Sequence, residues 1–286
     1  MDKHARQQAI DLYDRFTHDG MERRAFMAEM ARIAGGLAAA ELLIAGIAAS
    51  PAAAAQVAPD DKRLTTRTQT LTRGYKAYVA EPRTRSLKST VIVIHENRGL
   101  NDHIRDVARR LAVAGFRAVA PDMLSPSGGT PANEDSAREA IGKLDVGTSV
   151  NDAVAIASEL RKSSRGGKVG AVGFCWGGAF VNRLAVAAGD KLDAAVPYYG
   201  PAPDPSEAPK VKAPMMIHDA GLDTRVNATS FPWVEALRKA GKTVKFFLYE
   251  GVNHAFNNDT SAERYNKEAA DLAWNRTLAF FHRHLG

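Results

Sequence analysis

The stretch KVGAVGFCWGGAFV, residues 168–181, contains the only cysteine of the chain and decides which fold is expected. An apolar run that ends at Phe174 predicts a buried strand, and the residues from Trp176 onward have the pattern of a helix. Cys175 lies between the two, in the order strand, Gly-x-Cys-x-Gly, helix. This order is typical of a nucleophile elbow, with cysteine in the place of serine.

The residue types around Cys175 agree with such a turn. A turn this tight holds the nucleophile in a strained conformation, and side chains at Gly173 and Gly177 would collide with the neighbouring strand and helix. The start of a helix also favours a thiolate and, later in a reaction, an oxyanion. A lone cysteine can be a small buried spacer, but within this elbow we interpret Cys175 as the candidate nucleophile.

The sequence after about residue 60 predicts a single α/β domain, residues 56–286. Residues 64–82 have the alternation of an antiparallel hairpin around Arg73-Gly74. After the hairpin, short apolar runs alternate with amphipathic helical patterns. We therefore expect a central, mostly parallel sheet that is flanked by helices and preceded by the hairpin.

A thiol nucleophile needs a base, and the base needs an acid that orients it. In hydrolases of this fold the chain order is nucleophile, acid, histidine. Asp223 and His254 each follow a predicted strand, so both are expected at the carboxyl edge of the sheet, where ligands bind. Asp219 competes as the acid and His218 as the base, although a histidine at a strand end is more typical of the core. Four histidines near the chain ends are expected to be solvated: His4, His18, His282 and His284.

Four motifs, taken in this order, resemble the dienelactone hydrolase family of the α/β-hydrolases: VIVIHENRGL, GFCWGG, GLDTRV and GVNHAF. The resemblance covers about residues 64–286 and implies the α/β-hydrolase fold. It also implies a catalytic triad of Cys175, His254 and Asp223.

The same resemblance implies roles for residues next to the triad. Glu96 is expected to be the carboxylate beside the resting thiol. The backbone N–H groups of Asn97 and Trp176 are expected to form the oxyanion hole. The implied activity is that of a carboxymethylenebutenolidase-like hydrolase, which cleaves small esters or lactones through an acyl-enzyme and needs no metal or other cofactor. Two alternatives are a hydrolase fold retained only for binding, and thioester or amide hydrolysis at the same elbow.

The chain departs from the family where the substrate carboxylate is bound. Members specific for dienelactone use two arginines there, and Arg138 stands in the place of one. Asn258 stands where the second is expected, and Gly142 where a tyrosine is expected. Because losing a bidentate arginine weakens the grip on a carboxylate, we expect a less anionic ester or lactone. Arg98 either compensates for the missing charge or lies at the surface, and Phe256 either lines the pocket or packs.

Residues 1–55 have a different pattern. A polar leader is followed by Arg23-Arg24, by an Ala/Leu/Ile/Gly-rich stretch from Ile33 to Ala49, and by Ala53-Ala54-Ala55. This pattern resembles a twin-arginine export signal and predicts a periplasmic or secreted protein. A retained helical arm and a membrane anchor are the alternatives, and without export the protein is expected to be cytoplasmic.

Composition limits the other classes of function. Hydrophobic residues make up 45% and charged residues 24% of the chain, as in an ordinary globular protein. The net charge of +6 is scattered, which argues against a nucleic-acid partner. A single cysteine excludes an internal disulfide and a zinc site built from cysteines. We expect a small-molecule substrate, a monomer or small homo-oligomer, and membrane contact only through the N-terminal segment.

Overall fold

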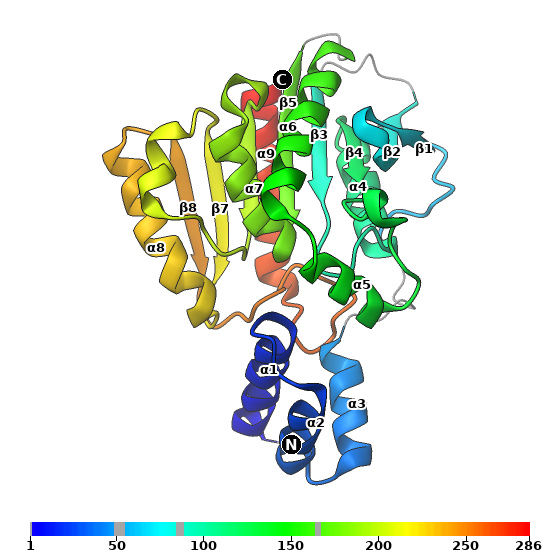
Figure 1. The fold of residues 1–286 in the computed structure, drawn as a ribbon, viewed down its shortest axis with the longest axis vertical. Coiled ribbons are helices and arrows are strands. Elements are labelled where there is room, and N and C mark those ends of the chain that lie inside the picture. The colour runs from blue at the N-terminus through cyan, green and yellow to red at the C-terminus, as the bar shows by residue number, and fades with distance from the viewer. Residues whose placement is uncertain (1, 49–54, 84–88, 164–166) are drawn as a thin grey trace.

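The computed structural model describes residues 2–48, 55–83, 89–163 and 167–286, and a mixed sheet forms its centre (Figure 1). Within these residues the sheet has eight strands in the order β1-β2-β4-β3-β5-β6-β7-β8. β1 pairs antiparallel with β2, and β2 with β4, whereas all other pairs are parallel. The predicted hairpin and mostly parallel sheet are therefore confirmed. The strands are β1 (Leu64–Thr70), β2 (Lys76–Pro82), β3 (Ser89–Ile94), β4 (Arg117–Pro121), β5 (Lys168–Phe174), β6 (Ala194–Tyr198), β7 (Met215–Ala220) and β8 (Val244–Tyr249).

Helices cover both faces of the sheet because successive side chains of each strand point to opposite faces. Val91 and Val93 of β3 pack in one apolar layer with α4 and α9. Ile92 and Ile94 pack in a second layer with α6, α7 and α8. The helices are α4 (Asp102–Val113), α5 (Glu134–Gly142), α6 (Val146–Ser163), α7 (Trp176–Ala187), α8 (Thr224–Lys239) and α9 (Lys267–Leu285).

The N-terminal helices α1 (Lys3–His18), α2 (Arg23–Ala34) and α3 (Leu37–Ile47) lie beyond the carboxyl ends of the parallel strands (Figure 1). The expected polar leader is therefore a helix, which begins where the Asp2 side chain accepts a hydrogen bond from the Ala5 N–H at 2.7 Å. These helices have an apolar core of their own, separate from the two layers on the sheet. Its buried members are Ala9, Ile10, Leu12, Tyr13, Phe26, Met30, Ala40 and Ile47.

The Ala-rich stretch of the N-terminal segment is not one continuous helix. The chain turns between α2 and α3 at Gly35 and Gly36, whose φ angles are 80° and 147°. Within the described residues no single helix is long and apolar enough to cross a membrane, and α2 and α3 reach that length only as a pair bent by 102°. Two residues of the expected processing site, 53 and 54, lie outside the described residues. Export and cleavage stay predictions.

A carboxyl group in the core makes stability depend on pH. Asp219 of β7 is fully buried, and burial raises the pKa of its carboxyl from 3.8 to about 7. Between these two values the folded chain keeps a proton that the unfolded chain has released. The free energy of unfolding therefore falls as pH rises through this window.

We predict that Asp219→Asn removes this pH dependence. The variant should melt at a higher temperature than the wild type at pH 7 and at nearly the same temperature at pH 4. Thermal unfolding followed by circular dichroism across this range measures the effect. Asp102→Asn, at an exposed position of α4, is the control and should keep the wild-type profile. Equal pH slopes for Asp219→Asn and the wild type would contradict the prediction.

Candidate active site

The turn at Cys175 has the backbone geometry that an elbow requires. Cys175 joins β5 to α7 with φ 55° and ψ −115°, a region that side-chain-bearing residues rarely adopt. A Cβ on Gly173 would collide with the carbonyl oxygen of Gly177, and a Cβ on Gly177 with the carbonyl oxygen of Ile94. The two glycines therefore let α7 start directly against β3 and β5, with Cys175 at the carboxyl edge of the sheet.

Asp223 and His254 meet at the same edge. Asp223 precedes α8 and caps it, because its Oδ1 accepts a hydrogen bond from the Val226 N–H at 3.1 Å. Its Oδ2 accepts a hydrogen bond from Nδ1 of His254, in the loop after β8, at 2.5 Å. A ring nitrogen of His254 lies within 4.8 Å of Sγ of Cys175. The three side chains that the motifs imply as a triad are thus neighbours.

Charge in this buried group shifts two pKa values. Burial acts to lower the pKa of His254, but the negative charges of Cys175 and Asp223 outweigh it and raise the pKa to about 10. Burial acts to raise the pKa of Asp223, but the charge of His254 and its hydrogen bond outweigh it and lower the pKa. Both shifts favour the charged forms, an imidazolium and a carboxylate.

Asp219 and His218, the alternative acid and base, do not take part in the contact between Asp223 and His254. The carboxylate that bonds His254 belongs to Asp223, whereas Asp219 is buried in β7. His218 uses both ring nitrogens in the core, with the hydroxyl of Tyr249 at 3.0 Å and that of Thr277 at 3.1 Å. Burial lowers the pKa of His218 to about 3. His218 is therefore a neutral core histidine.

Glu96 lines the cavity at Cys175, and its hydrogen bond is with Asn258. Nδ2 of Asn258 donates to Oε2 of Glu96 at 2.6 Å, and both residues are buried. Oδ1 of Asn258 accepts hydrogen bonds from the backbone N–H of Thr260 at 3.0 Å and from its hydroxyl at 2.6 Å. The residue in the place of the expected arginine therefore orients Glu96 and its own loop.

Asn97 and Trp176 lie on the two sides of the elbow. Asn97 lines the cavity from the loop after β3, and Trp176 is the first residue of α7. The N–H of Trp176 follows Cys175 directly. Because the first N–H groups of a helix have no hydrogen-bond partner within the helix, this group can bind a substrate oxygen. The Trp176 indole turns towards the body of the protein and stacks on His95, with 5.5 Å between ring centroids.

The three residues expected to bind substrate differ in position. Arg98 and Arg138 line a second pocket beside the cavity. Arg98 pairs with Glu134 at 2.7 Å, and Arg138 with Asp135 at 3.4 Å. Phe256 lines neither space, because it is fully buried among tyrosine rings beneath the site. Its role is therefore packing.

The expectation that the terminal histidines are solvated holds for His4 and His282, which are exposed. His284 is partly buried, and its ring centroid lies 4.4 Å from that of Phe280. For His18 the expectation is wrong. This residue is half-buried at the elbow.

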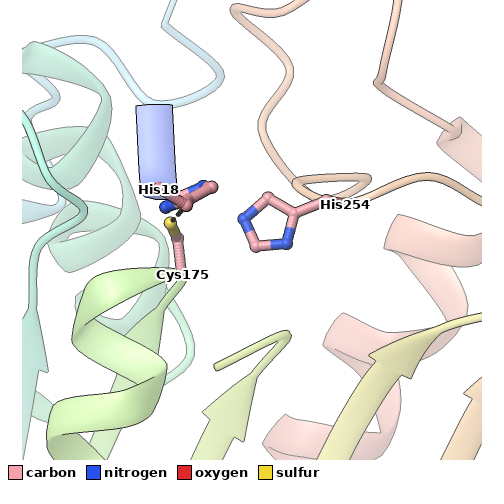
Figure 2. Close-up of side chains that lie close together, drawn as sticks. All are labelled: His18, Cys175 and His254. Carbon is pink, nitrogen blue, oxygen red and sulfur yellow. Dashed lines mark hydrogen bonds between the residues drawn. The ribbon is translucent and has the colours of Figure 1, made fainter. Parts of the chain in front are cut away.

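α1 ends with His18 over the nucleophile. Nε2 of His18 lies 3.7 Å from Sγ of Cys175 (Figure 2). The His18 ring also meets the His254 ring edge to face, with 5.0 Å between centroids. Tyr13 and Thr17, from the preceding turn of α1, line the same cavity. Side chains from the first eighteen residues therefore form one wall of the site.

Arg264 holds the N-terminal helices beside the site, although the sequence patterns do not single it out. Its buried guanidinium donates hydrogen bonds to the carbonyl of Ile47 at 3.1 Å and to Oγ of Ser261 at 3.0 Å. It also bonds the carboxylate of Asp14 at 3.3 Å and lies 5.2 Å from the centre of the Tyr13 ring. One cation thus connects α1 and the end of α3 to the loop that follows His254.

Among the described residues, two spaces lie between the N-terminal helices and the edge of the sheet. The cavity at Cys175 has a volume of about 20 Å³, which holds a single water molecule. The second pocket has about 160 Å³ and shares Tyr13, Thr17, Asn97 and Arg98 with the first. Its lining on the side of the N-terminal helices is largely apolar: Phe16, Phe26, Met27, Ile44 and Ala48.

Comparisons with known proteins agree on the α/β part of the chain. The profile of the Dienelactone hydrolase family matches residues 75–285. A protein of Saccharolobus solfataricus named "Putative carboxymethylenebutenolidase" is 31% identical over 246 residues, covering 73% of this chain and 93% of its own length. A protein of the same name from Methylorubrum extorquens is 33% identical over 225 residues, covering 73% of this chain and 76% of its own length.

Solved structures extend the agreement to three dimensions. The structure titled "Crystal Structure of Putative Dienelactone Hydrolase from Klebsiella pneumoniae subsp. pneumoniae MGH 78578" superposes with a TM-score of 0.70 at 28% identity. It covers 77% of this chain and 99% of its own. The family match begins at residue 75, so α1, α2 and α3 lie outside it. The four motifs all lie within the residues that the family profile matches, and the chain is a hydrolase that belongs to the dienelactone hydrolase family of the α/β-hydrolases.

Proposed function

We propose that the protein hydrolyses small carboxylic esters or lactones through an acyl-enzyme formed on Cys175. One observation carries the proposal: the imidazole of His254 is bonded to Asp223 through Nδ1 and lies beside the thiol of a strained elbow. The arrangement has a nucleophile, a base and a group that orients the base. The name carboxymethylenebutenolidase, which the relatives carry, supports an ester or lactone substrate.

The proposed reaction has two steps. The thiolate of Cys175 attacks the carbonyl carbon, and the tetrahedral intermediate collapses to a thioester while His254 gives its proton to the leaving alcohol oxygen. His254 then takes a proton from water, which attacks the thioester and releases the acid and the thiol. Asp223 stabilises the imidazolium form of His254 in both steps.

The developing oxyanion needs donors that are already in position. The backbone N–H of Trp176 and that of Asn97 are the proposed donors, one from each side of the elbow. Removing one such donor costs about 2.7–4 kcal/mol of transition-state stabilisation in a comparable enzyme. Glu96 is hydrogen-bonded to Asn258 in the same cavity. We propose that its carboxylate helps to keep the thiol of Cys175 neutral until substrate binds.

The second pocket supports a substrate with little negative charge. Arg23, Arg98 and Arg138 supply its positive charge, but each already pairs with a carboxylate of Glu134 or Asp135. Asn258, in the place of the expected second arginine, bonds Glu96. The opposite wall is largely apolar. We therefore propose a neutral or weakly anionic ester or lactone whose apolar part lies against α1 and α2.

Hydrolysis of p-nitrophenyl acetate tests the proposal. Cys175→Ala and His254→Ala should each lower kcat/KM by at least about a thousandfold, because residues that act as one catalytic unit are each required. His282→Ala, at an exposed position of α9, is the control for a histidine that should not matter.

Circular dichroism of each variant checks that the fold is kept. If the wild type releases no p-nitrophenol, the hydrolase fold serves binding and the proposal fails. Equal turnover by folded Cys175→Ala and the wild type would place the chemistry elsewhere. A panel of thioesters and amides, assayed beside the ester, separates ester hydrolysis from thioester or amide hydrolysis at the same elbow.

A further inference from the structure

The N-terminal helix adds a third potential metal ligand to the site. His18, Cys175 and His254 come from α1, the elbow and the loop after β8, and their side chains converge on one point (Figure 2). One donor atom from each residue lies within 4.8 Å of the other two. The single cysteine excludes only metal sites that need several thiolates. A site of one cysteine and two histidines needs only one.

The imidazole of His254 has the surroundings of a metal ligand. Nδ1 of His254 donates to the carboxylate of Asp223. Nε2 of His254 has no hydrogen-bond partner among the described residues, and the residue is 2% exposed. Histidines that bind zinc usually donate their other ring N–H to a carboxylate in this way, which fixes the ring and raises its basicity.

The distances agree with a tetrahedral ion. Bonds of about 2.3 Å to sulfur and about 2.05 Å to nitrogen put the two donor atoms about 3.6 Å apart at the tetrahedral angle. The measured separation of Sγ in Cys175 and Nε2 in His18 is 3.7 Å. The separations that involve His254 are at most 4.8 Å, so this third ligand needs to move by up to about 1.5 Å. The adjoining cavity of about 20 Å³ leaves space for one water as a fourth ligand.

Charge at the site also favours a divalent cation. The thiolate of Cys175 and the carboxylate of Asp223 together balance a charge of two. Glu96 lines the same cavity, and the two arginines in its lining each bond a carboxylate: Arg98 bonds Glu134, and Arg264 bonds Asp14. A thiolate with two imidazoles suits Zn²⁺, whereas Mg²⁺ and Ca²⁺ prefer oxygen ligands.

We propose that His18, Cys175 and His254 form a binding site for Zn²⁺ or a similar soft divalent cation, and that the bound ion holds α1 over the thiol. Binding replaces the thiol proton and any proton on the imidazole nitrogens with metal bonds, and no oxidation is involved. The consequence is reversible inhibition, since the thiolate is then not free to attack a carbonyl. This inhibition rests on the proposed ester hydrolysis, whereas the binding site does not.

Co²⁺ is the probe for the site, because a thiolate ligand gives it a sulfur-to-cobalt charge-transfer absorption band. The full-length chain, cleared of metal with a chelator, should bind one Co²⁺ and show this band, and added Zn²⁺ should remove it. Cys175→Ala should abolish the band. His18→Ala should weaken Co²⁺ binding by at least about 100-fold, the upper range for loss of a supporting partner, since a direct ligand is lost. His4→Ala, at an exposed position on the same helix, should bind like the wild type.

The outcomes separate the two proposals. Equal Co²⁺ affinity for His18→Ala and the wild type, with both folded by circular dichroism, would overturn the metal site. A band that is absent from the wild type would also overturn it and would leave His18 as a polar neighbour of the thiol. Co²⁺ binding without ester hydrolysis would support the site and reject the proposed function. In an active enzyme, Zn²⁺ should inhibit the wild type and His4→Ala at concentrations at least about 100-fold lower than those that inhibit His18→Ala.

Discussion

The strained backbone of Cys175 is the constraint on which the rest of the site depends. A φ of 55° with ψ −115° is unfavourable for a residue with a side chain, and such strain persists only where the surroundings hold it. Here the surroundings are the contact of α7 with β3 and β5, which Gly173 and Gly177 permit, and a hydrogen bond from the Cys175 N–H to the carbonyl of Tyr198 at 3.1 Å. The turn points Sγ away from the sheet edge and leaves the first N–H groups of α7 beside it.

The N-terminal helices cover the edge of the sheet at which Cys175 lies. In related folds the edge is open to ligands, but here α1 lies over Cys175 and leaves about 20 Å³ next to the thiol. α1 therefore narrows the approach of an ester to Sγ. Cleavage after residue 55, as the export pattern predicts, would remove His18, Tyr13 and the apolar wall of the second pocket together. Whether the working enzyme retains residues 1–55 therefore determines its pocket as well as its location.

The sequence predicts the α/β part closely, for physical reasons. Strands buried on both faces have near-continuous apolar runs, and an elbow needs glycine at two defined positions, so both leave a local pattern. The order Cys175, Asp223, His254 follows from the order of the strands. By contrast, the bond between Asn258 and Glu96 joins loops far apart in the chain, and no local pattern predicts it.

The placement of α1 is a similar case. Apolar residues at a spacing of three or four, together with the cap at Asp2, predict this helix, and Ile10, Tyr13 and Phe16 lie along one side of it. The polar composition of the segment makes this pattern easy to miss. That signal does not say where the helix docks. Docking depends on partners such as Arg264, which bonds both Asp14 and the end of α3, and on Asn253, which accepts a hydrogen bond from Gln7 at 2.7 Å. Such contacts between distant segments are visible only in the folded chain.

The proposed mechanism requires Cys175 to carry the acyl group. Mass spectrometry of the wild-type protein, quenched with acid shortly after mixing with p-nitrophenyl acetate, measures this directly. We expect one acetyl group per chain, on the peptide that contains Cys175, and its loss as the reaction proceeds to completion. An active enzyme whose acetyl group is found on another residue, or on none under conditions in which a burst of p-nitrophenol is seen, would contradict this mechanism.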